Sequence, residues 1–143
     1  MKIAYRLITL ALLTFAASPS FAACTYATVQ GKWSVTYADF DSNIGYSTYG
    51  IARATFEPAT RKVSLLGGKE SAFGQVASGT GSGSYTINSA CQGVITLTFG
   101  VGGPAVRFDF VVSGTADSPR INFIISEPTN ALSGQGFMQK IEL

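Results

Sequence analysis

The charged side chains best placed for chemistry lie inside apolar, β-branched segments rather than at turns: Arg53, Arg107 and Asp109. Arg107 and Asp109 are two residues apart, so an extended strand places them on the same face. On an inward face, this pair and Arg53 would orient a polar group of a ligand. On an outward face, the pair is a solvent-exposed salt bridge worth less than about 1 kcal/mol. The sequence favours the outward arrangement, because most charges on strands face solvent, but both arrangements stay open.

Aromatic side chains supply the remaining candidates for ligand binding, namely Trp33, Tyr37, Tyr49 and Tyr85. Tyrosine joins an apolar ring to a polar tip, which gives specificity to a mostly apolar pocket. A small barrel is just wide enough to be filled by such rings or to hold one small ligand. The sequence therefore predicts a pocket for a small apolar or aromatic ligand, with a solid aromatic core as the alternative.

Several other chemistries find no support in the residues present. The chain has no histidine, which removes the commonest general base and the commonest metal ligand. The segment 39–43 spaces its oxygen side chains like a calcium loop, but Ile44 and Gly50 stand where such a loop needs glycine and glutamate. The glycine-rich segment 79–84 lacks the lysine of a phosphate-binding loop. We therefore expect no metal and no cofactor, and the sequence argues against an enzyme more than for one.

The N-terminal segment 1–22 is typical of a secretory signal peptide. It has a short basic start, an apolar run from Leu7 to Ala17, and small residues before a cleavage site after Ala22. The apolar run would be about 16 Å long as a helix, too short for roughly 30 Å of hydrocarbon. We expect a mature domain of residues 23–143 in the periplasm or outside the cell, with no transmembrane segment.

The formal charge of +2 belongs to this leader and not to the mature domain. Lys2 and Arg6 are two of the ten basic side chains, and eight acidic side chains balance the others. A neutral domain lacks the clustered Lys and Arg of a nucleic-acid-binding surface. The sequence predicts a small ligand or a protein as partner, and no nucleic acid.

Cys24 and Cys91 are the two cysteines of the chain, and both follow the cleavage site. A single pair has one possible connectivity, so we predict a Cys24–Cys91 disulfide, as expected in an oxidising compartment. The alternative is a lipoprotein, because the segment 21–24 resembles the processing box in which the cysteine is acylated. That alternative would leave Cys91 as an unpaired thiol.

From Gly31 onward, short runs rich in Val, Ile, Thr, Tyr and Phe alternate with clusters of Gly, Pro, Asn, Asp and Ser. This pattern is typical of an all-β domain. The connections are short, so successive strands are expected to pair antiparallel, and closure would remove exposed strand edges. We predict a small up-and-down β-barrel of eight or nine strands, with a two-sheet sandwich as the alternative. The predicted strands are 31–38, 46–56, 62–66, 72–78, 82–88, 93–99, 105–113, 120–126 and 135–142.

A central motif of the form G-x-Y-x-(I/V)-N-x-x-C-x-G is carried by Gly83, Tyr85, Ile87, Asn88, Cys91 and Gly93. With the QGKW strand before it and the FDFVVSG, INFIIS and LSGQGF segments after it, this motif resembles a broad group of small exported bacterial and fungal proteins. These are calycin-like or allene-oxide-cyclase-type β-barrels, mostly of unassigned activity. The resemblance covers nearly the whole mature chain and implies an exported barrel.

Three functions are compatible with this sequence. A binding barrel for a small apolar or aromatic ligand needs an interior cavity, and this is the favoured hypothesis. A protein-interaction module or inhibitor at the cell surface would use exposed loops such as 39–46 or 129–135. A cyclase of the allene-oxide-cyclase type would place an acid or a tyrosine deep in a cavity and needs no histidine, since shaping a reactive substrate can suffice.

Overall fold

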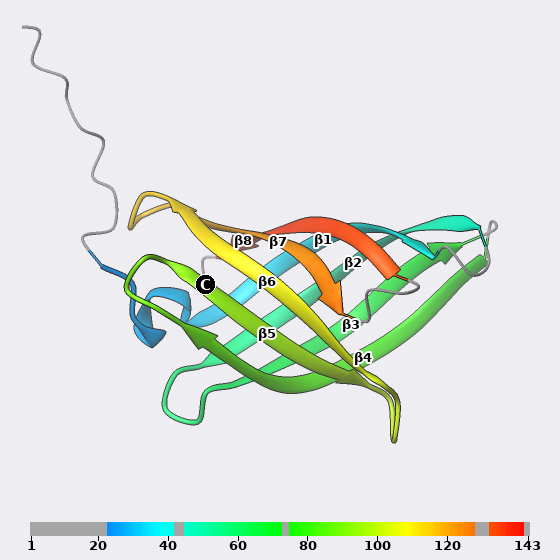
Figure 1. The fold of residues 1–143 in the computed structure, drawn as a ribbon, viewed down its shortest axis with the longest axis horizontal. Helices are drawn as coiled ribbons and strands as arrows, with labels where there is room; N and C mark the ends of the chain where they lie inside the picture. The colour runs from blue at the N-terminus through cyan, green and yellow to red at the C-terminus, as the bar shows by residue number, and fades with distance from the viewer. Residues whose placement is uncertain (1–22, 42–44, 73–74, 128–131, 142–143) are drawn as a thin grey trace, which may run out of the picture.

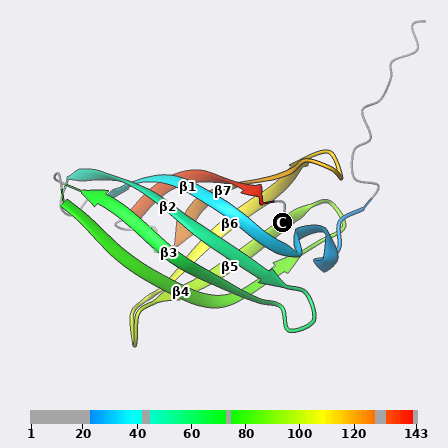
Figure 2. The same cartoon turned by 180° about the vertical axis from the view of Figure 1, so that it is seen from behind.

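Alternation of apolar and polar residues along most of the strands lets the sheet close around an apolar interior. The computed structural model describes residues 23–41, 45–72, 75–127 and 132–141, which form a closed antiparallel β-barrel (Figure 1). Each strand pairs with its neighbour in sequence, and β8 pairs back onto β1. The strands run obliquely around the long axis, as the reverse view in Figure 2 also shows. Their bounds are β1 Gly31–Asp41, β2 Tyr46–Glu57, β3 Lys62–Ala72, β4 Gln75–Ile87, β5 Gln92–Phe99, β6 Ala105–Gly114, β7 Pro119–Glu127 and β8 Leu132–Lys140.

The predicted all-β, up-and-down barrel is confirmed, and the described residues form eight strands. The two segments predicted as separate strands, 72–78 and 82–88, belong largely to the single long strand β4. Glycines between them suggested a break in the sequence. In the structure these glycines, Gly79 and Gly81, continue the ladder with β3. At Gly83, within the second predicted segment, an added Cβ would lie 1.8 Å from the backbone oxygen of Thr96 on β5. Glycine is needed there for close approach of the strands and not for a turn.

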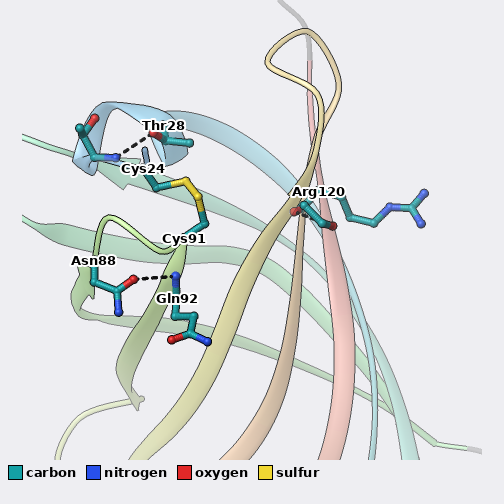
Figure 3. The surroundings of a disulfide bond; sticks show 8 residues. Cys24, Thr28, Asn88, Cys91, Gln92 and Arg120 are labelled. Carbon is teal, nitrogen blue, oxygen red and sulfur yellow. Dashed lines mark hydrogen bonds between the residues drawn. A yellow bond between two sulfur atoms is a disulfide. The ribbon is translucent and has the colours of Figure 1, made fainter. Parts of the chain in front are cut away.

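The predicted disulfide is confirmed. Cys24 and Cys91 are bridged across a sequence separation of 67 residues (Figure 3). Cys91 lies in the turn between β4 and β5, and the backbone N–H of Cys24 donates to the carbonyl of Ser89 in the same turn. In this state the sulfur of Cys24 is not free to carry a lipid. The bridge ties the segment before β1 to one end of the barrel.

The tied segment includes a short 3₁₀ helix, η1 (Tyr26–Val29), which the sequence pattern did not predict. The indole N–H of Trp33 donates to the carbonyl of Val29 at 2.9 Å. The ring of Tyr26 packs on Tyr85 at 5.4 Å between centroids, and Tyr85 packs edge-on against Phe56 at 5.0 Å. Buried aromatic rings therefore fill the end of the barrel next to η1.

β3 contains a bulge. Between Leu65 and Gly68, β3 advances by three residues while its partner β4 advances by two. Gly67 supplies the extra residue with a φ of +61°, the left-handed conformation that glycine adopts at little cost. The extra residue reverses the alternation of inward and outward side chains along the rest of the strand.

The reversal decides which charged residue of β3 faces the interior. Before the bulge, the odd-numbered Val63 and Leu65 are buried. After it, the even-numbered Glu70 lines the interior, whereas Lys69 is exposed and donates to the hydroxyl of Ser78 at 2.6 Å. If the same sequence paired without a bulge, Lys69 would take the position opposite Ala77 that Glu70 occupies.

Candidate functional site

Toward the end of the barrel away from η1, the interior contains a partly open cavity of about 260 Å³. This volume is just below the roughly 300–1,000 Å³ of sites for drug-sized ligands. A 150 Å³ apolar cavity can bind benzene, so by proportion this one suits a ligand of about ten non-hydrogen atoms. Most of the wall is apolar and includes Leu65, Ile95, Leu97, Val106, Phe108 and Met138.

One edge of the cavity is polar, and Tyr37 forms its centre. Tyr37, Gly50 and Glu70 occupy matching positions on β1, β2 and β3. The phenol ring crosses over Gly50, where a Cβ would lie 2.0 Å from the ring carbon Cζ, and its hydroxyl donates to Glu70 Oε2 at 2.9 Å. Because Gly50 has no side chain, Tyr37 of β1 can reach across β2 and bind Glu70 of β3.

A second polar pair lies beside the first. Asp39 and Thr48 are directly opposite each other on β1 and β2, and both line the cavity. The hydroxyl of the buried Thr48 donates to Asp39 Oδ1. Two carboxylates, one phenol and one hydroxyl thus face an otherwise apolar space.

Electrostatics at this edge favour the protonated form of Tyr37. Burial raises the pKa of Tyr37 well above its usual value of 10.0, and the hydrogen bond to Glu70 and the negative charges of Glu70 and Asp39 raise it further. The phenol therefore remains a hydrogen-bond donor across the physiological pH range. Burial, and to a smaller extent Tyr26, also raises the pKa of Tyr85.

The structure separates the seven ligand-binding candidates taken from the sequence, all of which lie in the described residues. Tyr37 lines the cavity. Trp33 and Tyr85 are fully or almost fully buried in the aromatic cluster next to η1 and do not line the cavity. The hydroxyl of Tyr85 is buried there without a hydrogen bond to any described residue.

The other four candidates lie on the outer face. Tyr49 is 65% exposed, and Arg53 is also exposed to solvent. Arg107 and Asp109 share a face, as the sequence indicated. Arg107 Nη2 lies 3.2 Å from Asp109 Oδ1 in a salt bridge, and both side chains are 42% exposed. Glu127 Oε1 lies 4.0 Å from Arg107 Nη1, so Arg107 has a second carboxylate partner on the outer face.

The outer face also has a wider concavity, of about 1030 Å³, which is open to solvent and follows the outside of several strands. Tyr49, Asp109, Ile124 and Phe137 are among the residues that line it. The guanidinium of Arg120 lies 5.5 Å from the ring centre of Phe137. The interior cavity is the better candidate for a small ligand, since it is more enclosed than the outer concavity and combines an apolar wall with a few polar groups.

Sequence reasoning missed three residues of the cavity edge: Asp39, Thr48 and Glu70. The alternation of Trp33, Val35 and Tyr37 would have placed Asp39 inward if it had been continued for two more residues. Thr48 and Glu70 gave no comparable signal, because their positions depend on strand register and on the bulge in β3.

No family model and no curated protein sequence matches this chain. Among the described residues, no three His, Cys, Asp or Glu side chains are grouped closely enough to hold a metal ion. Those residues also include no helix that is long and apolar enough to cross a membrane.

Proposed function

We propose that this protein is an exported binding barrel that holds one small apolar or aromatic ligand in its interior. The observation that carries the proposal is the cavity of about 260 Å³, with its apolar wall and its single polar edge. Apolar contact supplies affinity in such a site, and a few placed polar groups supply orientation. The continuous hydrogen-bonded ring of strands keeps the cavity wall rigid.

The disulfide supports the location that the proposal requires. Disulfides persist in oxidising compartments, and the Cys24–Cys91 bridge fits a protein of the periplasm or the cell exterior. The segment 1–22, interpreted above as a signal peptide, lies outside the described residues. The resemblance to calycin-like barrels, which rests on the sequence motif around Tyr85, agrees with this proposal.

A protein-interaction module is the second candidate, and exposed apolar side chains favour it. Tyr49, Ile51 and Val76 line the same shallow depression on the outer face and are 65%, 59% and 67% exposed. Exposed apolar patches of this kind often bind another protein. Such a function would need no interior ligand. Of the two loops suggested for it, parts of 39–46 and 129–135 lie outside the described residues.

The cyclase alternative also requires the interior, since it expects an acid or a tyrosine in a cavity. Glu70 and Tyr37 fit that requirement in type. The two interior functions differ in outcome, because a carrier releases its ligand chemically unchanged and a cyclase does not.

Calorimetric titration with indole, a neutral bicyclic ring of suitable size, tests the proposal. Val106 lines the cavity, whereas Val111 lies on the same strand, β6, and is 41% exposed on the outer face. We expect one indole per wild-type chain, loss of binding in Val106→Trp, and unchanged binding in Val111→Trp. Failure of the wild type to bind indole or any other small aromatic probe, or equal binding of indole by both variants, would contradict an interior site.

A further inference from the structure

The hydrogen-bonding groups at the cavity edge indicate what kind of polar group a ligand would present. The hydroxyls of Tyr37 and Thr48 both point their protons at carboxylates, Glu70 and Asp39 respectively. Neither hydroxyl proton is therefore left for a ligand. The second carboxylate oxygen of Glu70, Oε1, makes no hydrogen bond within the described residues. An ionised carboxylate accepts hydrogen bonds and donates none. A ligand group that binds at this edge must therefore donate a hydrogen bond.

The charge at the same edge has one sign. Glu70 and Asp39 line the cavity, and no Lys or Arg is among its lining residues in the part of the chain that the structure describes. The nearest cation along β3, Lys69, is exposed on the opposite face because of the bulge. The raised pKa of Tyr37 has the negative charges of Glu70 and Asp39 among its causes. Partly buried carboxylates favour a cation as neighbour.

We propose that the ligand is a small aryl-alkyl amine, with its ammonium group on Glu70 and its ring against the apolar wall. This inference rests on the proposed binding function and specifies its ligand. An ammonium group donates three hydrogen bonds, and a charge-assisted bond to a carboxylate is about twice as strong as a neutral one. The cavity has room for about ten non-hydrogen atoms, which matches one ring with a short amine chain. A ligand of the same size with an ionised carboxylate would be repelled by Glu70 and Asp39.

Three probes of nearly equal shape test this inference by calorimetric titration of the processed, disulfide-bonded protein. They are 2-phenylethylamine, 2-phenylethanol and phenylacetate, which carry a cation, a neutral hydroxyl and an anion on the same ring. We expect the amine to bind about tenfold or more tightly than the alcohol, which corresponds to one charge-assisted contact. Phenylacetate should bind more weakly than both.

Glu70→Gln is the matching variant, because the amide oxygen still accepts the hydrogen bond from Tyr37 while the charge is lost. This variant should bind the amine about tenfold more weakly, and the alcohol as before. Glu127→Gln removes the same charge from the outer face, where that side chain is 63% exposed, and should leave all three affinities unchanged. Circular dichroism and the mass of the disulfide-bonded chain establish that both variants fold.

The outcomes separate the inference from the proposed function. Equal binding of amine and alcohol, preference for phenylacetate, or an unchanged amine affinity in Glu70→Gln would overturn the inference and leave a general apolar binding site. Failure of all three probes, and of indole, to bind the wild type would overturn both.

Discussion

Substituting Gly50 with alanine tests the packing that builds the polar edge of the cavity. The backbone of Gly50 has no positive φ, so alanine meets no conformational barrier there. The difficulty is steric, because an added Cβ would lie 2.0 Å from Cζ, 2.2 Å from Cε1 and 2.3 Å from the hydroxyl oxygen of Tyr37. The phenol ring must therefore move away from β2.

The size of the effect follows from these distances. Carbon atoms pack best at about 3.5–4.0 Å, so the ring must shift by roughly 1.5 Å. A shift of that size breaks the 2.9 Å hydrogen bond to Glu70, which costs about 1 kcal/mol. Overpacking destabilises the fold by about 1–3 kcal/mol more. Replacing glycine by alanine within a strand stabilises it by about 0.5–1 kcal/mol. We expect the free energy of unfolding to fall by about 1–3 kcal/mol.

Urea unfolding followed by circular dichroism measures this loss. With a slope of about 1–3 kcal/mol per molar urea, the midpoint should fall by roughly 1 M. Gly79→Ala is the matched control, because no atom lies within 4 Å of a Cβ at that position on β4. The control should be at least as stable as the wild type.

A double-mutant cycle identifies the clash. In a Tyr37→Ala background the ring is absent, so Gly50→Ala should hardly change the free energy of unfolding. The coupling energy between the two substitutions should therefore be nearly as large as the loss caused by Gly50→Ala alone. If Gly50→Ala alone is as stable as Gly79→Ala, or if its cost persists without the Tyr37 ring, the reasoning about this contact is refuted.

Three further predictions concern the disulfide, Tyr37 and the bulge. Replacing both Cys24 and Cys91 with serine should lower the free energy of unfolding by about 4 kcal/mol, since the bridge closes a loop across a separation of 67 residues; a loss under about 1 kcal/mol in urea unfolding would refute this. The folded pKa of Tyr37 is above the unfolded value of 10.0, so its contribution to stability is fully present below pH 10 and is lost as the pH rises further; unfolding measured from pH 9 to 12 should show a shallower decline in Tyr37→Phe, and identical slopes would contradict the raised pKa. Gly67→Ala should cost about 1 kcal/mol through its φ of +61° alone, because no atom is within 4 Å of a Cβ there, and Gly67→Asn should cost less; equal stability of alanine, asparagine and wild type in thermal unfolding would count against the bulge.

The fold was predicted from local patterns in the sequence. Period-two alternation in segments such as 105–113 indicated strands with one apolar face, and the structure places Val106 and Val112 in the interior and Val111 outside. The same alternation placed Arg107 and Asp109 on one face, where they form a salt bridge. Two cysteines that both follow the predicted cleavage site allow one pairing, and the structure contains that disulfide.

The cavity edge depends on relations that no local pattern contains. Tyr37 and Glu70 are 33 residues apart and meet because Gly50 lies between them on the intervening strand. The predicted strand at 62–66 ended before Glu70, because two consecutive glycines suggest a break. The structure instead uses Gly67 for a bulge and continues β3 to Ala72. A change of one residue in register decides whether a glutamate or a lysine faces the interior.

The central claim is that the barrel interior holds a small ligand, and native mass spectrometry of the purified protein tests it most directly. We predict that wild type and Val111→Trp carry the same adduct of roughly 150 Da, the mass of about ten non-hydrogen atoms in a cavity of this size. Val106→Trp, whose larger ring would take up most of that cavity, should lack the adduct. A wild-type protein without any adduct that also takes up neither indole nor 2-phenylethylamine, or an adduct retained in Val106→Trp, would contradict the account.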